Sequence, residues 1–343
     1  MTAPVNMAAA KRALADRAPP GAGSPPLLAV EGLTLEFRTR QGAVHALDGV
    51  SFDVFRGEIV GVVGESGSGK SVLAYAVMGL TDAAGRVRSG RIAFAGRDML
   101  GETPAQLSDT LGREVSMIFQ SPRTALNPIR RVGLQIADVL LRHGNMTRRD
   151  ARARAVEALA RVRVPDPERR FDAYPFELSG GLCQRVMIAM AIACDPYLLI
   201  ADEPTTGLDV TTQAVVMDLI RDQVRAANTS VLLITHDLAL AGEYCDRVVV
   251  MHAGHVVEVA PVEHLLRQPA HPYSALLIGA TPGASTRIED LSVIPGGLPD
   301  LRQALPPCRF LHRCTRSDAR CANEELPTHD LGDGHLVRCW NPL

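Results

Sequence analysis

A glycine-rich turn between an apolar segment and a helix-like segment constrains the fold of this 343-residue chain most strongly. The letters EIVGVVG (58–64) are typical of a buried strand, and SVLAYAVMGL (71–80) is typical of a helix. Across the turn, Gly64, Gly69, Lys70 and Ser71 fit the spacing G-x-x-x-x-G-K-[ST]. The sequence therefore predicts a strand, a phosphate-binding loop and a helix in this order.

The residue types in this turn suit a phosphate group. Glycines let backbone N–H groups surround phosphate oxygens, and the start of a helix favours an anion. Lys70 can reach the terminal phosphates of a nucleotide, and Ser71 can hold Mg²⁺. Only two of the 36 basic residues are lysines, Lys11 and Lys70, so a lysine at this position is not part of a general surface charge.

Two further apolar strands end in groups that could act on a phosphate. YLLIADEP (197–204) delivers Asp202, expected to orient Mg²⁺ through water, and Glu203, the candidate base for an attacking water. VLLITHD (231–237) ends in His236, which can contact the γ-phosphate. Parallel sheets bind ligands at the carboxyl ends of their strands, so we expect these groups near one ligand.

Helices and strands alternate from residue 180 onward, which predicts an α/β fold with a mostly parallel sheet. The expected elements are a helix at 181–194, a strand at 197–202, a helix at 211–227 and a strand at 230–235. The segment 130–163 is helix-like and rich in arginine, and we interpret it as a solvated helix face.

Composition excludes several classes of protein. The net charge of -2 gives no overall reason to expect nucleic acid as a partner. No apolar run approaches the roughly 20 residues of a membrane-spanning helix, and the start of the chain lacks the apolar stretch of a secretion signal. We expect a cytoplasmic protein whose residues 1–26, rich in Ala, Pro and Gly, form a disordered tail.

Six motifs in order resemble those of the ATP-binding subunits of ABC transporters, over about residues 28–260. LSGGLCQ (178–184) resembles the signature sequence and TGLD (206–209) the D-loop. GESGSGKS (64–71) is similar to the Walker A motif and LLIADE (198–203) to Walker B. Gln120 in MIFQSP occupies the Q-loop position, and His236 that of the switch histidine.

The resemblance implies a P-loop ATPase domain with an antiparallel β subdomain and a helical subdomain. It also implies head-to-tail dimers, in which Ser179, Gly180 and Gly181 cap the γ-phosphate of the ATP held by the partner subunit. Phe37 would stack on adenine, and Gln120 would bind Mg²⁺ and link it to the helical region. The residues expected to contact nucleotide or Mg²⁺ are Phe37, Gly64, Ser66, Gly67, Ser68, Gly69, Lys70, Ser71, Val72, Gln120, Ser179, Gly180, Gly181, Asp202 and Asp209; Glu203, His236 and Lys70 would be catalytic.

Within this family, the sequence is most similar to the dipeptide, oligopeptide and nickel permease group, and to the first of the two ATPase subunits of that group. QSPRTALNP (120–128) and the tail from HPYSALLIGATP (271–282) onward carry this likeness. The motifs differ from their commonest sequences at three positions, Leu182, Cys183 and Gly207. The resemblance implies a peripheral ATPase at the cytoplasmic face of the membrane that powers import of di- or oligopeptides or a related small solute.

The implied partners are two membrane-spanning permease subunits, a second ATPase subunit and, indirectly, an external solute-binding protein. Import of nickel or another non-peptide solute is the alternative substrate class. A soluble ABC ATPase that acts on DNA or the ribosome is the rival class, but it usually carries a coiled-coil insertion or two ATPase units, and neither is seen here. The chain leaves open the solute, whether the dimer is homo- or heteromeric, and whether both ATP sites are active.

Four of the seven cysteines, Cys308, Cys314, Cys321 and Cys339, lie in the last 36 residues. Cytoplasmic proteins seldom keep disulfides, so clustered cysteines indicate a metal centre. The spacing lacks the short pair typical of zinc, whereas four thiolates suit an iron–sulfur cluster. The resemblance implies a [4Fe–4S] cluster, with zinc or free thiols as alternatives. We place the ATPase domain at 27–280, with its helical subdomain at about 121–180, and a cysteine-bearing extension at 281–343.

Overall fold

The computed structural model describes residues 25–281 and 293–343, so nearly all of the predicted tail lies outside the described residues. The chain divides into two compact units. Among the described residues, the helical unit comprises Phe55–Glu58 and Thr103–Val231. The P-loop unit comprises Pro26–Val54, Ile59–Glu102 and Leu232–Leu343.

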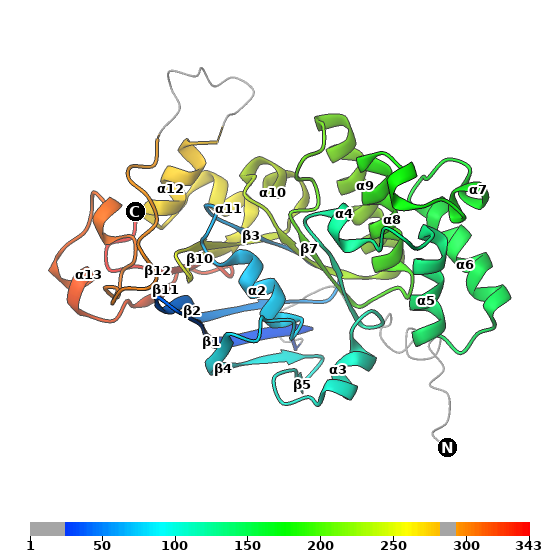
Figure 1. The fold of residues 1–343 in the computed structure, drawn as a ribbon. Helices are drawn as coiled ribbons and strands as arrows, with labels where there is room; N and C mark the ends of the chain where they lie inside the picture. Colours follow the sequence, from blue (N-terminus) through cyan, green and yellow to red (C-terminus); the bar gives the residue numbers. More distant parts are fainter. Residues whose placement is uncertain (1–24, 282–292) are drawn as a thin grey trace. The chain divides into compact units, whose positions relative to one another are not determined.

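The P-loop unit begins with an antiparallel sheet in the strand order β2-β1-β4-β5 (Figure 1). Leu28 of β1 lies opposite Val54 of β2 and Phe94 of β4, and all three side chains are buried. Buried apolar side chains of β1, β2 and β4 stabilise this sheet, whereas both residues of β5 are exposed. Its strands are β1 (Leu28–Thr39), β2 (Gly42–Val54), β4 (Gly85–Phe94) and β5 (Arg97–Asp98).

A second sheet of the P-loop unit runs in the order β11-β12-β10-β9-β3. Strand β3 is parallel to β9, and all five of its residues are buried, as expected for a strand covered on both faces. The remaining pairs are antiparallel. The bounds are β3 (Ile59–Val63), β9 (Arg247–His252), β10 (His255–Pro261), β11 (Thr328–Asp330) and β12 (Leu336–Arg338), with helices α2 (Lys70–Val77), α10 (Leu238–Tyr244), α11 (Val262–Arg267), α12 (Pro272–Gly279), η3 (Leu311–Arg313) and α13 (Ala319–Asn323).

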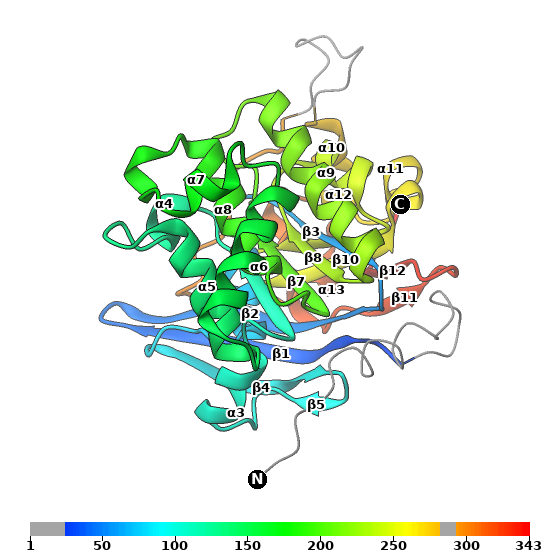
Figure 2. The same cartoon turned by 90° about the vertical axis from the view of Figure 1, so that its right-hand side faces the viewer.

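The helical unit holds helices α3 to α9, which run from turquoise to green in Figure 2, together with the parallel pair β6 and β7. Strand β8 (Ser230–Ile234) crosses the boundary between the two units. The strand and helices expected at 197–202, 181–194 and 211–227 are confirmed within two residues. The bounds are α3 (Pro104–Thr110), β6 (Val115–Ile118), α4 (Pro122–Ala125), α5 (Val132–His143), α6 (Arg148–Arg161), α7 (Pro167–Phe171), η1 (Pro175–Glu177), α8 (Gly180–Ile192), β7 (Leu198–Asp202) and α9 (Val210–Ala227).

Helix α6 shows why the arginine-rich segment is helical. Ala151, Ala155, Ala158 and Leu159 are buried at helical spacing, while the arginines of this helix are exposed. Thr147 caps its first turn by accepting a hydrogen bond from the backbone N–H of Asp150. The interpretation as a solvated helix face is confirmed.

The extension expected from residue 281 does not form a compact unit of its own, because its described residues pack into the P-loop unit. Strand β12 pairs with β10, which places Val337 opposite Glu258. Arg309 donates hydrogen bonds to the carbonyl oxygen of Ala253 and, at 2.6 Å, to the carboxylate of Asp48. The boundary at residue 280, as the limit of the ATPase domain, stays a prediction.

Three buried rings join the end of β9 to the extension. The ring of His252 lies 4.6 Å from that of Tyr273 and 5.2 Å from that of Phe310, measured between centroids. Burial is the largest cause that lowers the pKa of His252, to about 4, and the positive charge of Arg313 adds to it. His252 is therefore neutral in the folded protein at neutral pH.

The contact between Gly133 and Phe171 gives a prediction about stability. A methyl group on Gly133, within α5, would lie 2.1 Å from the ring of Phe171. Ala in place of Gly normally stabilises a helix, but here we expect Gly133→Ala to lower the free energy of unfolding by about 1–3 kcal/mol through overpacking. Gly180→Ala is the matched control, because no atom lies within 4 Å of its added methyl. Urea unfolding measures the free energy of unfolding of both variants. Equal values for Gly133→Ala and Gly180→Ala would refute the close contact with Phe171.

The buried state of His252 gives a prediction about pH. In the unfolded chain its pKa is about 6.5, so the unfolded state binds the proton first as the pH falls. This contribution to stability is complete above pH ~6.5 and is lost as the pH falls towards ~4. His252→Phe keeps a ring at this position and removes the titration. Urea unfolding at about pH 7.5 and about pH 4.5 should show a smaller acid loss in the variant, by up to about 3 kcal/mol. An equal loss in both proteins would contradict the buried neutral state.

Candidate functional site

Backbone contacts require glycine at two positions of the loop between β3 and α2. Gly64 has a φ of 150°, and a side chain there would lie 2.1 Å from the carbonyl oxygen of Met251. Gly69 has a φ of 102°, and its added Cβ would lie 2.8 Å from the carbonyl oxygen of Ala46. Because other residues rarely adopt these angles, the loop can close only with glycine at both positions.

The lysine of the loop is buried and bonded to the loop itself. The Nζ atom of Lys70 donates hydrogen bonds to the carbonyl oxygens of Gly64 and Glu65, both at 2.8 Å. These bonds draw the loop around the first turn of α2, which begins at Lys70. Ser71 and Val72 are half-buried in that turn, Ser66 and Gly67 are exposed, and Ser68 is buried. The predicted loop residues thus surround the start of one helix, where backbone N–H groups favour an anion.

Phe37 and His236, two other predicted nucleotide contacts, also belong to the P-loop unit. Phe37 is half-buried in β1, opposite Val44 of β2 and Gly85 of β4. His236 is exposed between β8 and α10. The adenine contact of Phe37 and the phosphate contact of His236 stay predictions.

The helical unit brings Gln120 and Glu203 into direct contact. Strand β7 ends at the buried Asp202, and Glu203 follows with a φ of 46°. The side-chain amide of Gln120 donates a 3.0 Å hydrogen bond to Oε2 of Glu203, and the Thr206 hydroxyl donates to the same atom at 2.8 Å. A left-handed φ at a residue other than glycine costs about 1–3 kcal/mol and occurs often at functional sites.

The signature segment forms the start of α8. Ser179 caps this helix by accepting a hydrogen bond from the backbone N–H of Leu182. Gly180 has open space around its Cα, and a methyl group on Gly181 would make only an ordinary contact with Thr212. The predicted contact of this helix start with a partner's ATP concerns a second chain and stays a prediction.

Sequence reasoning missed a contact between the signature helix and the segment after β7. The buried side chain of Gln184 donates a 2.7 Å hydrogen bond to the carbonyl oxygen of Pro204. Thr206, which bonds Glu203, was also missed. Gln184 and Thr206 lie inside the signature and D-loop motifs, and this position is the only feature of the sequence that could have indicated a role for them.

Asp209, in the expected D-loop, caps helix α9. Its carboxylate accepts hydrogen bonds from the backbone N–H of Thr212 at 3.0 Å and from the Thr212 hydroxyl at 2.7 Å. The hydroxyl bond is the main cause that lowers the pKa of Asp209. The structure therefore assigns Asp209 a local structural role, and its nucleotide contact stays a prediction.

The four cysteines of the extension form no disulfide in the part of the chain that the structure describes, and burial raises the pKa of three of them: Cys308, Cys314 and Cys339. For Cys308, whose pKa rises to about 12, the charges of the other three thiols add to this effect. Backbone N–H groups donate to Sγ of Cys314 at 3.4 Å and of Cys339 at 3.3 Å. No group of three or more His, Cys, Asp or Glu residues among those described has the arrangement of a single-ion metal site.

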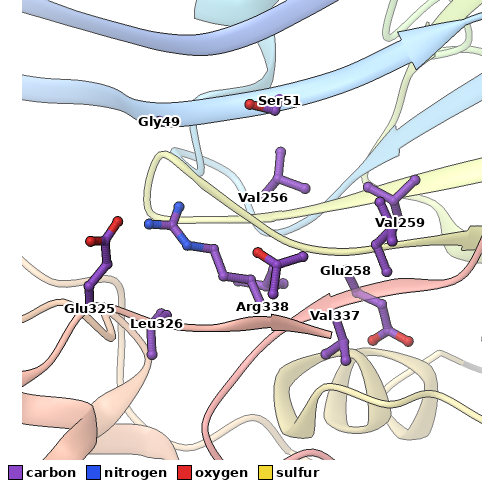
Figure 3. A pocket seen from close by; sticks show the side chains of 12 residues that line it. Gly49, Ser51, Val256, Glu258, Val259, Glu325, Leu326, Val337 and Arg338 are labelled. Carbon is purple, nitrogen blue, oxygen red and sulfur yellow. The ribbon is translucent and has the colours of Figure 1, made fainter. Parts of the chain in front are cut away.

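A pocket of about 330 Å³ in the P-loop unit contains none of the predicted site residues (Figure 3). It lies between β2, β10 and β12, and the side chain of Arg338 extends into it towards Gly49. Ser51, Glu258 and Glu325 are its other labelled residues with polar side chains. Across residues 25–281 and 293–343, no helix has the length and apolar character needed to cross a membrane.

Comparison with known proteins finds two regions of the chain that match known families. The family described as "ABC transporter" matches residues 47–206, and the family described as "Oligopeptide/dipeptide transporter, C-terminal region" matches residues 257–321. The chain is 44% identical over 318 residues to the probable D,D-dipeptide transport ATP-binding protein DdpD of Escherichia coli, which covers 92% of this chain and 97% of DdpD. It is also 44% identical to the oligopeptide transport ATP-binding protein AppD of Bacillus subtilis, over 92% of this chain and 96% of AppD.

Solved structures give the same result for the fold. The dimeric ATP-binding cassette MJ0796, bound to ADP and Pi in a post-hydrolysis state, matches 68% of this chain and 98% of its own length, at 25% identity and a TM-score of 0.62. The cbiO1 protein of Clostridium perfringens, part of the transporter complex cbiONQ, matches 71% of this chain and 91% of its own length, at 27% identity and a TM-score of 0.60. The predicted ABC ATPase fold is confirmed, and this chain belongs to the ABC transporter family of ATP-binding proteins, with the C-terminal region of oligopeptide/dipeptide transporters.

Proposed function

We propose that this chain is the ATP-hydrolysing subunit of an importer for di- or oligopeptides or a related small solute. The similarity to DdpD and AppD, which extends over 92% of this chain, supports this function. The match of residues 257–321 to the oligopeptide/dipeptide transporter region supports the peptide class over nickel. The observation that carries the ATPase activity is the loop before α2, where glycine is required at two positions and Lys70 is buried against the loop.

In this proposal, the loop and the first turn of α2 bind the phosphates of ATP. Backbone N–H groups from Ser66 to Val72 contact the phosphate oxygens, and Lys70 neutralises charge on the terminal phosphates. The Ser71 hydroxyl would hold Mg²⁺, with Gln120 as a further ligand, and Asp202 would orient the ion through water. The donors are oxygen atoms from a hydroxyl, a carboxylate and an amide, which are the types that Mg²⁺ prefers.

Glu203 is the proposed base for the attacking water, and His236 contacts the γ-phosphate. The hydrogen bond from Gln120 to Glu203 supports this role, because it fixes the carboxylate that must orient a water molecule. Phosphoryl transfer needs positioned charges more than covalent chemistry, so side chains held by such bonds are sufficient.

A second ATPase subunit completes the proposed site. Ser179, Gly180 and Gly181 cap the γ-phosphate of ATP bound by the partner, and the open space around Gly180 leaves room for such an approach. ATP held in this way favours the closed dimer, and its hydrolysis removes that preference. Two membrane-spanning permeases would couple this motion to transport at the cytoplasmic face of the membrane, and an external protein would deliver the solute.

We also propose that the four cysteines of the extension bind a [4Fe–4S] cluster. Four neighbouring thiols and backbone N–H groups directed at sulfur are typical of such a centre. In a cluster each cysteine binds a different iron atom, so its four ligands lie farther apart than those of a single ion. Zinc is the alternative.

Replacing Glu203 tests the proposed catalytic role. Glu203→Gln keeps an oxygen and the size of the side chain but removes the base, so ATP turnover should fall by at least about 100-fold while ATP still binds. The exposed Glu157 of α6 offers a matched control, since Glu157→Gln leaves the helix surface polar. Steady-state phosphate release and ATP binding are measured on the same preparations. Unchanged turnover in Glu203→Gln would remove this residue from the base role.

Replacing a cysteine tests the cluster. Protein purified without oxygen should contain iron and sulfide and absorb visible light, and Cys314→Ser should lose most of this absorption. Cys194→Ser is the control, because Cys194 lies in the helical unit. Zinc without iron in the purified protein would favour the alternative, and a metal-free protein would refute both.

Partners are tested by mass spectrometry of proteins that co-purify with the tagged chain from gently solubilised membranes. We expect two multi-span permeases, a second ATPase subunit or a second copy of this chain, and an external binding protein whose ligand identifies the solute. Recovery of only ribosomal or DNA-associated proteins would refute the transport function.

A further inference from the structure

Glu65, the second residue of the loop, forms an ion pair with the extension. Its carboxylate accepts two hydrogen bonds from Arg313, at 2.7 and 2.8 Å, one from each terminal nitrogen of the guanidinium. The side chain of Arg313 is only 5% exposed and that of Glu65 is 28% exposed. Such paired bonds are directional and stronger than those between neutral groups. Arg313 therefore fixes both the position and the orientation of this carboxylate.

Other residues of the extension hold Arg313 in place. Its Nε atom donates a 2.6 Å hydrogen bond to the carbonyl oxygen of Pro295. Its guanidinium carbon lies 5.6 Å from the centre of the Phe310 ring, within the range of a cation–π contact. The guanidinium is thus oriented before it meets Glu65.

The backbone of Glu65 connects this ion pair to Lys70. The N–H group of Glu65 donates a 2.9 Å hydrogen bond to the hydroxyl of Tyr273, at the start of α12. The carbonyl oxygen of Glu65 accepts the 2.8 Å bond from Lys70. One residue therefore has its carboxylate bound by Arg313, its N–H by Tyr273 and its carbonyl by Lys70.

A second contact places the extension against the same loop. A methyl group on Gly67 would lie 3.2 Å from Cδ1 of Leu298, so the leucine side chain lies next to this glycine. Leu298 and Arg313 come from different parts of the extension, and they contact the loop at residues 67 and 65. The extension thus covers the loop at two points.

We propose that Arg313 is a positioning residue for ATP binding, which acts through Glu65 on the phosphate-binding loop and Lys70. The inference rests on the proposed role of this loop. Arg313 has two effects in this scheme: it holds the backbone that carries the ligands, and it neutralises a carboxylate beside a site for phosphate. Without Arg313, the charge of Glu65 would be left half-buried near the phosphates and would repel them. The ATP site therefore includes residues of the oligopeptide/dipeptide transporter region.

The test is a double-mutant cycle on ATP affinity. Arg313→Met should weaken binding of Mg²⁺ and a non-hydrolysable ATP analogue to the purified full-length chain by about tenfold or more, because it breaks a charge-assisted pair and leaves a carboxylate unpaired. Adding Glu65→Gln to Arg313→Met should restore part of the affinity, because the repelling charge is gone. Arg313→Lys should retain part of the affinity, since it keeps the charge but loses one of the two bonds.

Arg302→Met is the matched control. This arginine also belongs to the extension, but it is exposed and pairs with Asp300. It should leave the affinity unchanged. Thermal unfolding without nucleotide is measured in parallel, and Glu65→Gln alone gives a second route to the same interaction if Arg313→Met does not fold.

The outcomes separate this inference from the proposed function. A normal affinity in Arg313→Met, or losses in Arg313→Met and Glu65→Gln that simply add in the double variant, would overturn the positioning role. Residues that act as one unit do not give additive losses. Lys70→Ala tests the loop itself. If both Lys70→Ala and Arg313→Met bind ATP normally, the proposed role of the loop fails. If Lys70→Ala loses ATP binding while Arg313→Met binds ATP normally, only the positioning role of Arg313 is refuted.

Discussion

The close approach of two backbone carbonyls to one loop determines much of the P-loop unit. The carbonyl of Met251, in β9, leaves no room for a side chain on Gly64, and that of Ala46, in β2, leaves none on Gly69. The loop is therefore enclosed by strands of both sheets of its unit. A loop held in this way has few alternative conformations, so its N–H groups are arranged before a phosphate arrives. This reduces the ordering cost of binding an anion.

Hydrogen bonds of the helical unit fix the second set of groups that we propose to act on ATP. Gln120 follows β6 and Glu203 follows β7, and these two strands are parallel neighbours. Their carboxyl ends lie at one edge, which is why residues 83 positions apart can form a hydrogen bond. Asp209 and Ser179 cap the helices on which the D-loop and the signature depend. Most of the predicted groups are thus set by strand ends and helix starts.

Local sequence patterns predicted the elements that depend on local forces. The buried run at 59–63 and the alanine stripe of α6 follow directly from hydrophobic spacing. The phosphate-binding loop could be predicted because its positive φ angles require glycine, and these glycines are visible in the sequence. The contact of Glu65 with Arg313 could not be predicted, since the two residues are 248 positions apart and neither has an unusual neighbour in the sequence. The pairing of β12 with β10 could not be predicted for the same reason, because it leaves no local signal in the sequence.

The distance along the chain between Glu65 and Arg313 has a consequence for biosynthesis. A ribosome adds about 5–20 residues per second, so the 248 residues between them take about 12–50 seconds to appear. During this interval the strands and the glycine loop can fold, but the carboxylate of Glu65 has no guanidinium to pair with. The loop reaches its final arrangement only after the extension has been made. Assembly of the nucleotide site is thus ordered in time, and a nascent chain that stops before Arg313 leaves this site unfinished.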